Sequence, residues 1–94
     1  MPRPKKPRKI CIDPEITYFK PRAVPLSELE EVTLEMDELE AIRLCDLEKL
    51  PQVEAAKKMR ISQSTLQRIL TESRRKIAQA LILGKAIKII KCKK

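Results

Sequence analysis

The sequence lacks the residue types on which most small active sites depend. It contains no histidine, and its 94 residues include a single glycine. Without histidine, no serine or cysteine has the usual base that would activate it as a nucleophile, and one glycine cannot form a phosphate-binding loop. The acids Asp37, Glu38 and Glu40 are interpreted as partners of a helix dipole rather than as catalytic carboxylates. We therefore expect no catalytic residue, no cofactor and no enzymatic activity.

Cysteine is sparse and widely spaced. Cys11, Cys45 and Cys92 include no C-x-x-C pair of the kind that holds zinc. We predict no metal site and reduced thiols in the cytosol, and hence a cytoplasmic protein. One alternative stays open. Cys11 and Cys92 would become neighbours if the two ends of the chain paired as strands, and a redox or metal role would then be available to them.

Long apolar runs are also absent. No stretch approaches the roughly 20 apolar residues that span a bilayer. The basic N-terminus is followed only by "ICI", whereas a secretory signal has about 7 to 15 apolar residues at that place. The sequence therefore predicts neither a membrane segment nor a signal peptide.

Charge is abundant and unevenly distributed. The formal net charge is +8. Residues 1–12 carry five bases and no acid, residues 26–50 carry nine acids against two bases, and residues 51–94 carry twelve bases against two acids. This division predicts one face that meets a polyanion and another face that is turned away from it.

Proline is concentrated at the start of a chain that is long enough for one domain. Six of the seven prolines lie within residues 1–25, and proline disfavours helix at its own position and at the preceding one. We predict a basic arm and an irregular segment over residues 1–33, with a possible short strand at "RKICI". Tyr18 and Phe19, the only aromatic residues, are expected to cover the edge of a helical core.

Aliphatic residues take helical spacing from Leu34 onward. The pattern predicts helices over residues 36–47, 52–59 and about 63–83. Pro51 suits the first turn of the second helix, Ser62 can cap the third by accepting the Thr65 amide, and Gly84 can end it. The apolar positions expected to form the core are Leu34, Leu39, Ile42, Leu44, Leu47, Val53, Ala56, Met59, Ile61, Leu66, Ile69, Leu70, Ile77, Ala80 and Leu81.

The C-terminal stretch "KAIKIIK" predicts a strand over residues 86–91, with a frayed extension of the preceding helix as the alternative. A lone strand is unstable in water, so it needs a partner, and "RKICI" is the candidate. The expected fold is mainly α, a three-helix core with a short two-stranded sheet formed by the N- and C-terminal segments. Residues 34–84 would form the helical domain and residues 85–94 a basic strand or tail.

The second and third predicted helices are joined by a tight turn, which is typical of a helix-turn-helix. Ala56 lies in the middle of the first of these helices, where a small side chain lets the two approach. At 100° per residue, the third helix presents a polar face opposite its apolar stripe. That face begins at a helix N-terminus, whose dipole favours phosphate.

Several motifs resemble known families. "AIRL", "EAAKKM" and "SQSTLQRIL" stand where the sigma-factor region-four type of helix-turn-helix has similar segments. Over almost the whole chain, "PRPKKPRKIC", "DELEAIRLCDLE" and "RRKIAQALILGKAIKI" resemble uncharacterised protein family 0251, small prokaryotic predicted DNA-binding proteins. One departure is Arg60, which stands where such turns usually have glycine. If φ is positive there, arginine costs on the order of 1 kcal/mol or more.

The residues and the resemblance together predict sequence-specific duplex DNA binding by a transcriptional regulator that acts as a homodimer. Base edges would be contacted by Gln63, Ser64, Gln67 and Arg68. Phosphates would be contacted by Lys57, Thr71, Arg74, Arg75, Arg3, Lys5, Lys6 and Arg8.

Two other functional classes remain, besides the plain alternative of a solvated helix face. The same helices could dock on a subunit of the transcription machinery, or the protein could bind RNA. The shortage of aromatic residues weighs against RNA, because recognition of single strands depends on stacking.

Overall fold

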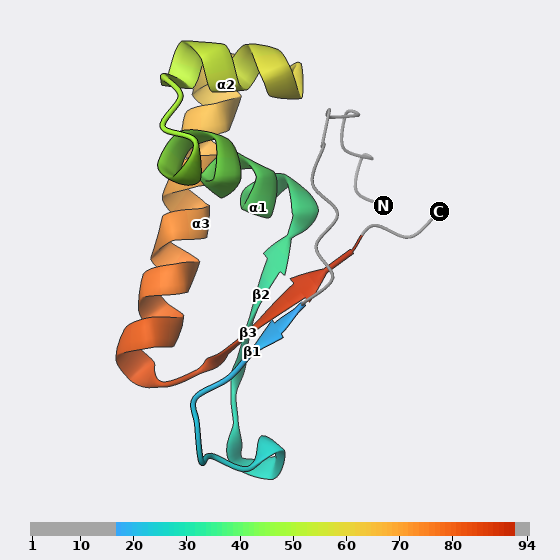
Figure 1. Cartoon of the computed structure of the whole chain (residues 1–94), viewed down its shortest axis with the longest axis vertical. Helices are drawn as coiled ribbons and strands as arrows, with labels where there is room; N and C mark the ends of the chain where they lie inside the picture. Colours follow the sequence, from blue (N-terminus) through green and yellow to red (C-terminus); the bar gives the residue numbers. More distant parts are fainter. Residues whose placement is uncertain (1–16, 92–94) are drawn as a thin grey trace.

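Figure 1 shows the computed structural model of the chain, in which residues 17–91 are described. Its helices are α1 (Met36–Ile42), α2 (Gln52–Met59) and α3 (Gln63–Leu83). Its strands are β1 (Tyr18–Phe19), β2 (Glu31–Glu35) and β3 (Ala86–Ile90). A 3-10 turn, η1 (Leu26–Glu28), precedes β2, and a π-helical turn, η2 (Arg43–Leu47), continues α1. The prediction of a mainly helical fold with a small sheet is confirmed.

The hydrophobic core lies where the three helices meet. Met59 of α2 and Leu66 of α3 are completely buried, and full burial of a side chain of this size contributes about 1.5 to 3 kcal/mol. Ala55 and Ala56 allow α2 to approach its neighbours closely. The buried cluster consists of Ala41, Leu44, Ala55, Ala56, Met59, Leu66 and Leu70.

The prediction that Val53 belongs to the core is wrong. Val53 is 47% exposed, and Ala55, which was not predicted, is buried in its place. The reason is helical geometry. Val53 precedes Ala55 by two residues, or about 200° around the helix, and so lies on the opposite side of α2.

The helix predicted over residues 36–47 is present, but its last five residues form the wider turn η2. The amide of Glu48 bonds to the carbonyl of Arg43 at 2.9 Å, five residues back, as in a π-helix. Because the winding changes there, Leu44 stays buried whereas Leu47 is 74% exposed. The prediction of a buried Leu47 is therefore wrong.

The sheet has the strand order β1-β3-β2, with β3 antiparallel to β1 and parallel to β2. The strand predicted over residues 86–91 is confirmed as β3, but two unpredicted strands are its partners, and "RKICI" lies outside the described residues. Leu34, predicted as helical, lies opposite Ile89 in β2. Both side chains are buried, so this pairing ties the sheet to the helical core.

The two aromatic residues do not cover the helical core as predicted. They form β1, which lies beside β3 (Figure 1). Phe19 is more than half exposed, and the hydroxyl of Tyr18 donates a hydrogen bond to Glu31 Oε2 at 2.7 Å. This bond joins the two outer strands of the sheet across β3.

The last turn of α3 leaves an apolar tip, which we define as Leu81, Ile82 and Leu83. Their exposed fractions are 74%, 81% and 61%. Leu81 continues the predicted apolar stripe but lies outside the core, because α3 extends beyond the part that α1 and α2 cover (Figure 1). No helix within residues 17–91 has the length and apolar character needed to cross a membrane.

The burial of Ala56 predicts the effect of enlarging it. Ala56→Leu should lower the free energy of unfolding by about 1 to 3 kcal/mol, because the added carbons have no room between α2 and α3. Lys58→Leu is the control, since it places the same side chain at an exposed position of α2; it should change stability by less than about 0.5 kcal/mol. Urea denaturation measures both. Wild-type stability of Ala56→Leu would show that Ala56 does not lie at the helix crossing.

Candidate nucleic-acid interface

The turn between α2 and α3 sets the direction of α3. Arg60 ends α2 in the left-handed conformation, with φ of 59° and ψ of 44°. The amide of Arg60 bonds to the carbonyl of Lys57 at 3.1 Å, and that of Ile61 to the carbonyl of Ala56 at 3.1 Å. This closure is the Schellman type, which usually has glycine at the left-handed position. The condition stated for Arg60 is met, because its φ is positive.

Ser62 begins α3 as predicted. Its Oγ accepts a hydrogen bond from the Thr65 amide at 3.1 Å and donates one to Thr65 Oγ1 at 2.8 Å. The first turn of α3 contains no acidic residue. The positive end of the helix dipole is therefore not offset by a carboxylate on that turn, which suits an anionic ligand.

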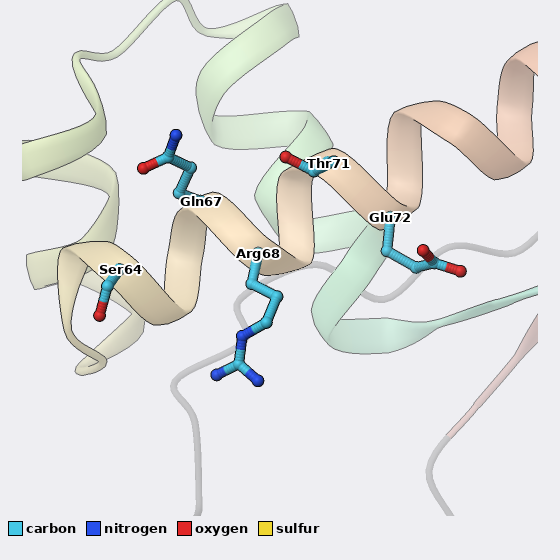
Figure 2. Close-up of a pocket in the computed structure, with 5 residues that line it drawn as sticks. All are labelled: Ser64, Gln67, Arg68, Thr71 and Glu72. Carbon is cyan, nitrogen blue, oxygen red and sulfur yellow. The ribbon is translucent and has the colours of Figure 1, made fainter.

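The residues predicted to contact bases share one solvent-facing surface at the start of α3. Gln63, Ser64, Gln67 and Arg68 are all exposed. Figure 2 shows that Gln67 projects from one side of this surface, and Ser64 and Arg68 from the other. Ser64, Gln67 and Arg68, together with two residues of the next turn, line an open hollow. Its lining is Ser64, Gln67, Arg68, Thr71 and Glu72.

The charge pattern predicted that acidic residues lie on a face turned away from this surface. Instead, acidic residues border it. A second hollow joins Arg68 to the junction of β2 and α1, where Glu35, Asp37 and Glu38 lie. The local structure explains the position, because Glu38 closes a capping box with Glu35 at the start of α1. Carboxylates therefore lie beside Arg68, at one edge of the exposed polar surface of α3, and Glu72 lines this second hollow as well.

Two of the predicted phosphate contacts already have acidic partners. Arg74 Nη2 lies 2.7 Å from Asp46 Oδ1, and Arg75 Nη2 lies 2.6 Å from Glu72 Oε2. The hydrogen bond that Arg74 donates to Asp46 raises the pKa of Arg74, and the hydrogen bond that Arg75 donates to Glu72 lowers the pKa of Glu72. Sequence analysis missed both pairs and Glu72 itself. The spacing of Glu72 and Arg75, three residues apart on a helix, was the available signal for one of them.

The remaining predicted phosphate contacts fall into two groups. Lys57 of α2 and Thr71 of α3 are exposed, and neither forms an ion pair within residues 17–91. Contacts assigned to the basic arm lie outside the described residues, namely Arg3, Lys5, Lys6 and Arg8.

A polar contact holds α1 against α3 below the hollow. Lys76 Nζ lies 2.9 Å from Glu38 Oε1, and both side chains are mostly buried. The hydroxyl of Ser73, completely buried, donates to the Ile69 carbonyl at 2.6 Å and lies 3.4 Å from the Glu38 carbonyl. These buried polar groups have hydrogen-bond or ion-pair partners, and the contacts fix the position of α3 relative to α1.

The cysteines present no site within the described residues. No group of three side chains from histidine, cysteine, aspartate and glutamate between residues 17 and 91 is arranged to hold a metal. Cys45 is a half-buried free thiol, and burial raises its pKa, which lowers the reactivity of a thiol. Cys11 and Cys92 lie outside the described residues.

The fold and the helix surface define a class: a small, mainly helical protein with a mixed three-stranded sheet and one exposed polar helix face. Residues 1–93 match a family model described as "Protein of unknown function DUF134". The chain belongs to this family, also called UPF0251, which confirms the resemblance to uncharacterised protein family 0251.

Relatives of the chain are similar over nearly all of its length. It is 56% identical to a UPF0251 protein of Caldanaerobacter subterraneus subsp. tengcongensis. The 89 aligned residues cover 95% of this chain and 75% of that protein. It is 53% identical to a UPF0251 protein of Halothermothrix orenii. The 88 aligned residues cover 94% of this chain and 65% of that protein. The chain therefore spans 65% to 75% of the length of these two relatives. No solved structure matches the chain.

The strained turn predicts a stabilising substitution. Arg60→Gly should raise the free energy of unfolding by up to about 1 kcal/mol, because a left-handed residue without Cβ avoids a cost of about 1 to 2 kcal/mol and loses part of this gain through the greater freedom of unfolded glycine. Arg60→Ala is the control, since it removes the charge and keeps Cβ. Thermal unfolding compares them. Equal stabilisation by alanine would assign the effect to the lost charge.

Proposed function

We propose that the protein binds duplex DNA sequence-specifically as a transcriptional regulator, with α2 and α3 acting as a helix-turn-helix. The observation that supports this most is the exposed surface of Gln63, Ser64, Gln67 and Arg68 at the start of α3. These side chains follow a tight turn, lie on the uncompensated positive end of a helix dipole, and carry the donors and acceptors that match base edges.

The geometry suits a major groove. The stretch from Gln63 to Thr71 covers about 12 Å along the helix axis at ~1.5 Å per residue, comparable with the groove width of about 12 Å. In this arrangement Arg68 pairs with guanine and the two glutamines suit adenine. Lys57 on α2 would contact the DNA backbone, as the first helix of such motifs does.

The alternatives have less support. Single-stranded RNA needs aromatic platforms beside its basic groups, but Tyr18 and Phe19 lie in β1, away from the start of α3 (Figure 1). Docking on the transcription machinery remains, and it differs from the proposal because it requires no duplex DNA. Competition between duplex DNA, single strands and RNA separates all three.

Binding to duplex DNA should fall steeply with salt, because contacts between basic side chains and phosphates release counterions. Within that binding, Arg68→Ala should relax the preference at one base pair by about 1 to 3 kcal/mol. Lys57→Ala is the matched control, since it should weaken all sequences alike and reduce the salt slope by about one. Fluorescence anisotropy over a panel of duplexes measures both effects. Affinity that does not change with salt, or identical behaviour of the two variants, would contradict the proposal.

We extend the proposal to a homodimer joined through the apolar tip. One helix-turn-helix contacts few base pairs, and specific sites usually combine two half-sites about 34 Å apart. The tip offers three exposed aliphatic side chains on the same helix that would enter the groove, so a contact between two tips would also set the relative position of the two recognition surfaces. A two-fold contact needs only one self-complementary patch.

The dimer predicts a concentration-dependent mass. Light scattering of the full chain at micromolar concentration should give twice the monomer mass, and Ile82→Glu should give the monomer, because a carboxylate at an 81% exposed position leaves the fold intact but opposes burial in an interface. Val53→Glu is the control, an equivalent change at an exposed aliphatic residue on α2. A monomeric wild type, or a dimer that both variants leave unaffected, rules out the tip as the interface.

A further inference from the structure

Glu72 is the unexpected member of the proposed DNA-binding surface. It is the only acidic residue of the five that line the open hollow, and Figure 2 shows its carboxylate beyond Arg68 on the same side of α3. A carboxylate among groups that meet DNA lowers affinity for every sequence, because it repels phosphates. Two explanations are available for this position of Glu72: a role in the stability of the fold, or a hydrogen bond accepted from a donor on the DNA.

Arg75 holds this carboxylate in one orientation. Its Nη2 donates to Glu72 Oε2 at 2.6 Å and its Nε donates to Glu72 Oε1 at 3.3 Å. A two-point contact of this kind fixes the plane of the carboxylate. The contact from Arg75 also lowers the pKa of Glu72, so at neutral pH the group is ionised and acts only as an acceptor.

A role in stability does not account for the position of Glu72. The side chains of Glu72 and Arg75 are 46% and 58% exposed, and exposed ion pairs contribute little to stability. A second ion pair, between Arg74 of α3 and Asp46, has nearly the same distance and exposure. Asp46, however, belongs to η2 and does not line the hollow. Of these two pairs, only that of Glu72 places its carboxylate at the hollow lined by Ser64, Gln67 and Arg68, the proposed base contacts.

We propose that Glu72 is a specificity-determining residue that accepts a hydrogen bond from the amino group of a cytosine, and that Arg75 is the residue that positions it. Cytosine offers a donor in the major groove, whereas guanine offers there the acceptors N7 and O6, which a carboxylate repels. The inference rests on the proposed binding of duplex DNA. It also changes the role of Arg75 from a phosphate contact to a support for Glu72, since Nε and Nη2 of its guanidinium are already engaged.

The matched pairs supply the test. Glu72→Ala and Asp46→Ala each remove one exposed carboxylate and release one arginine on α3, so both should bind random duplex more tightly than the wild type. Only Glu72→Ala should change base preference. Sequences bound by the full chain are selected from a random duplex pool, and affinities are measured for the best site with each base at the position in question. We expect Glu72→Ala to reduce discrimination for cytosine by about 5- to 140-fold, the equivalent of ~1 to 3 kcal/mol.

Arg75→Ala distinguishes positioning from phosphate contact. A positioning residue should relax preference at the same base pair as Glu72→Ala, whereas a phosphate contact would weaken all sequences alike and lower the salt slope by about one. The second result overturns the role given to Arg75. A wild-type chain that selects a defined site, together with Glu72→Ala that selects the same site with equal discrimination, overturns the role of Glu72 alone. A wild-type chain that selects no duplex sequence overturns the DNA-binding proposal and this inference with it.

Discussion

The parallel pairing of β2 with β3 is the constraint on which the rest of the structure depends. β2 runs directly into α1, and β3 follows α3 after Gly84, which ends the helix in the left-handed conformation. Five residue pairs, from Glu31–Ala86 to Glu35–Ile90, hold the end of α3 at one end of the strand pair and the start of α1 at the other. With both ends held, the helices between them can only close on one another, and α2 must fill the remaining side of the core. The sheet is small, but it holds the three helices in one defined arrangement.

The two charge classes of the sequence are joined in the fold rather than separated by it. Acids of the β2–α1–η2 region pair with bases of α3: Glu38 with Lys76 at 2.9 Å and Asp46 with Arg74 at 2.7 Å. The first pair is mostly buried and bonded further through the capping box, so it contributes to the docking of α1. The second is exposed, and its contribution to stability is small. The charge segregation along the sequence therefore serves helix docking as well as any contact with a polyanion.

Sequence reasoning succeeded where the signals are local and failed where they are not. Pro51, Ser62 and Gly84 each act within one turn of their own position, and the start of α2 and both ends of α3 follow from them. β2 was missed because "EVTLE" alternates correctly for a strand but precedes a helical pattern without a break, and its partner lies more than fifty residues away. Leu47 was misplaced because nothing local announces a π-helical turn. At the candidate site the exposed polar side chains were predictable from helical periodicity, whereas the Arg74–Asp46 pair depends on how α1 and η2 pack against α3.

These ion pairs change what the net charge of +8 implies about binding. Four bases of the C-terminal half have acidic partners within the described residues, namely Arg74, Arg75, Lys76 and Lys85. Such bases release few counterions on meeting DNA, because contact with a phosphate must first displace a carboxylate. The charge that remains for nonspecific attraction on α2 and the start of α3 lies on side chains such as Lys57 and Arg68. These charges attract every sequence alike, so discrimination among sequences must come from polar groups held in fixed positions. Under the DNA-binding proposal, the capped, closely packed start of α3 is the part of the molecule best suited to hold them.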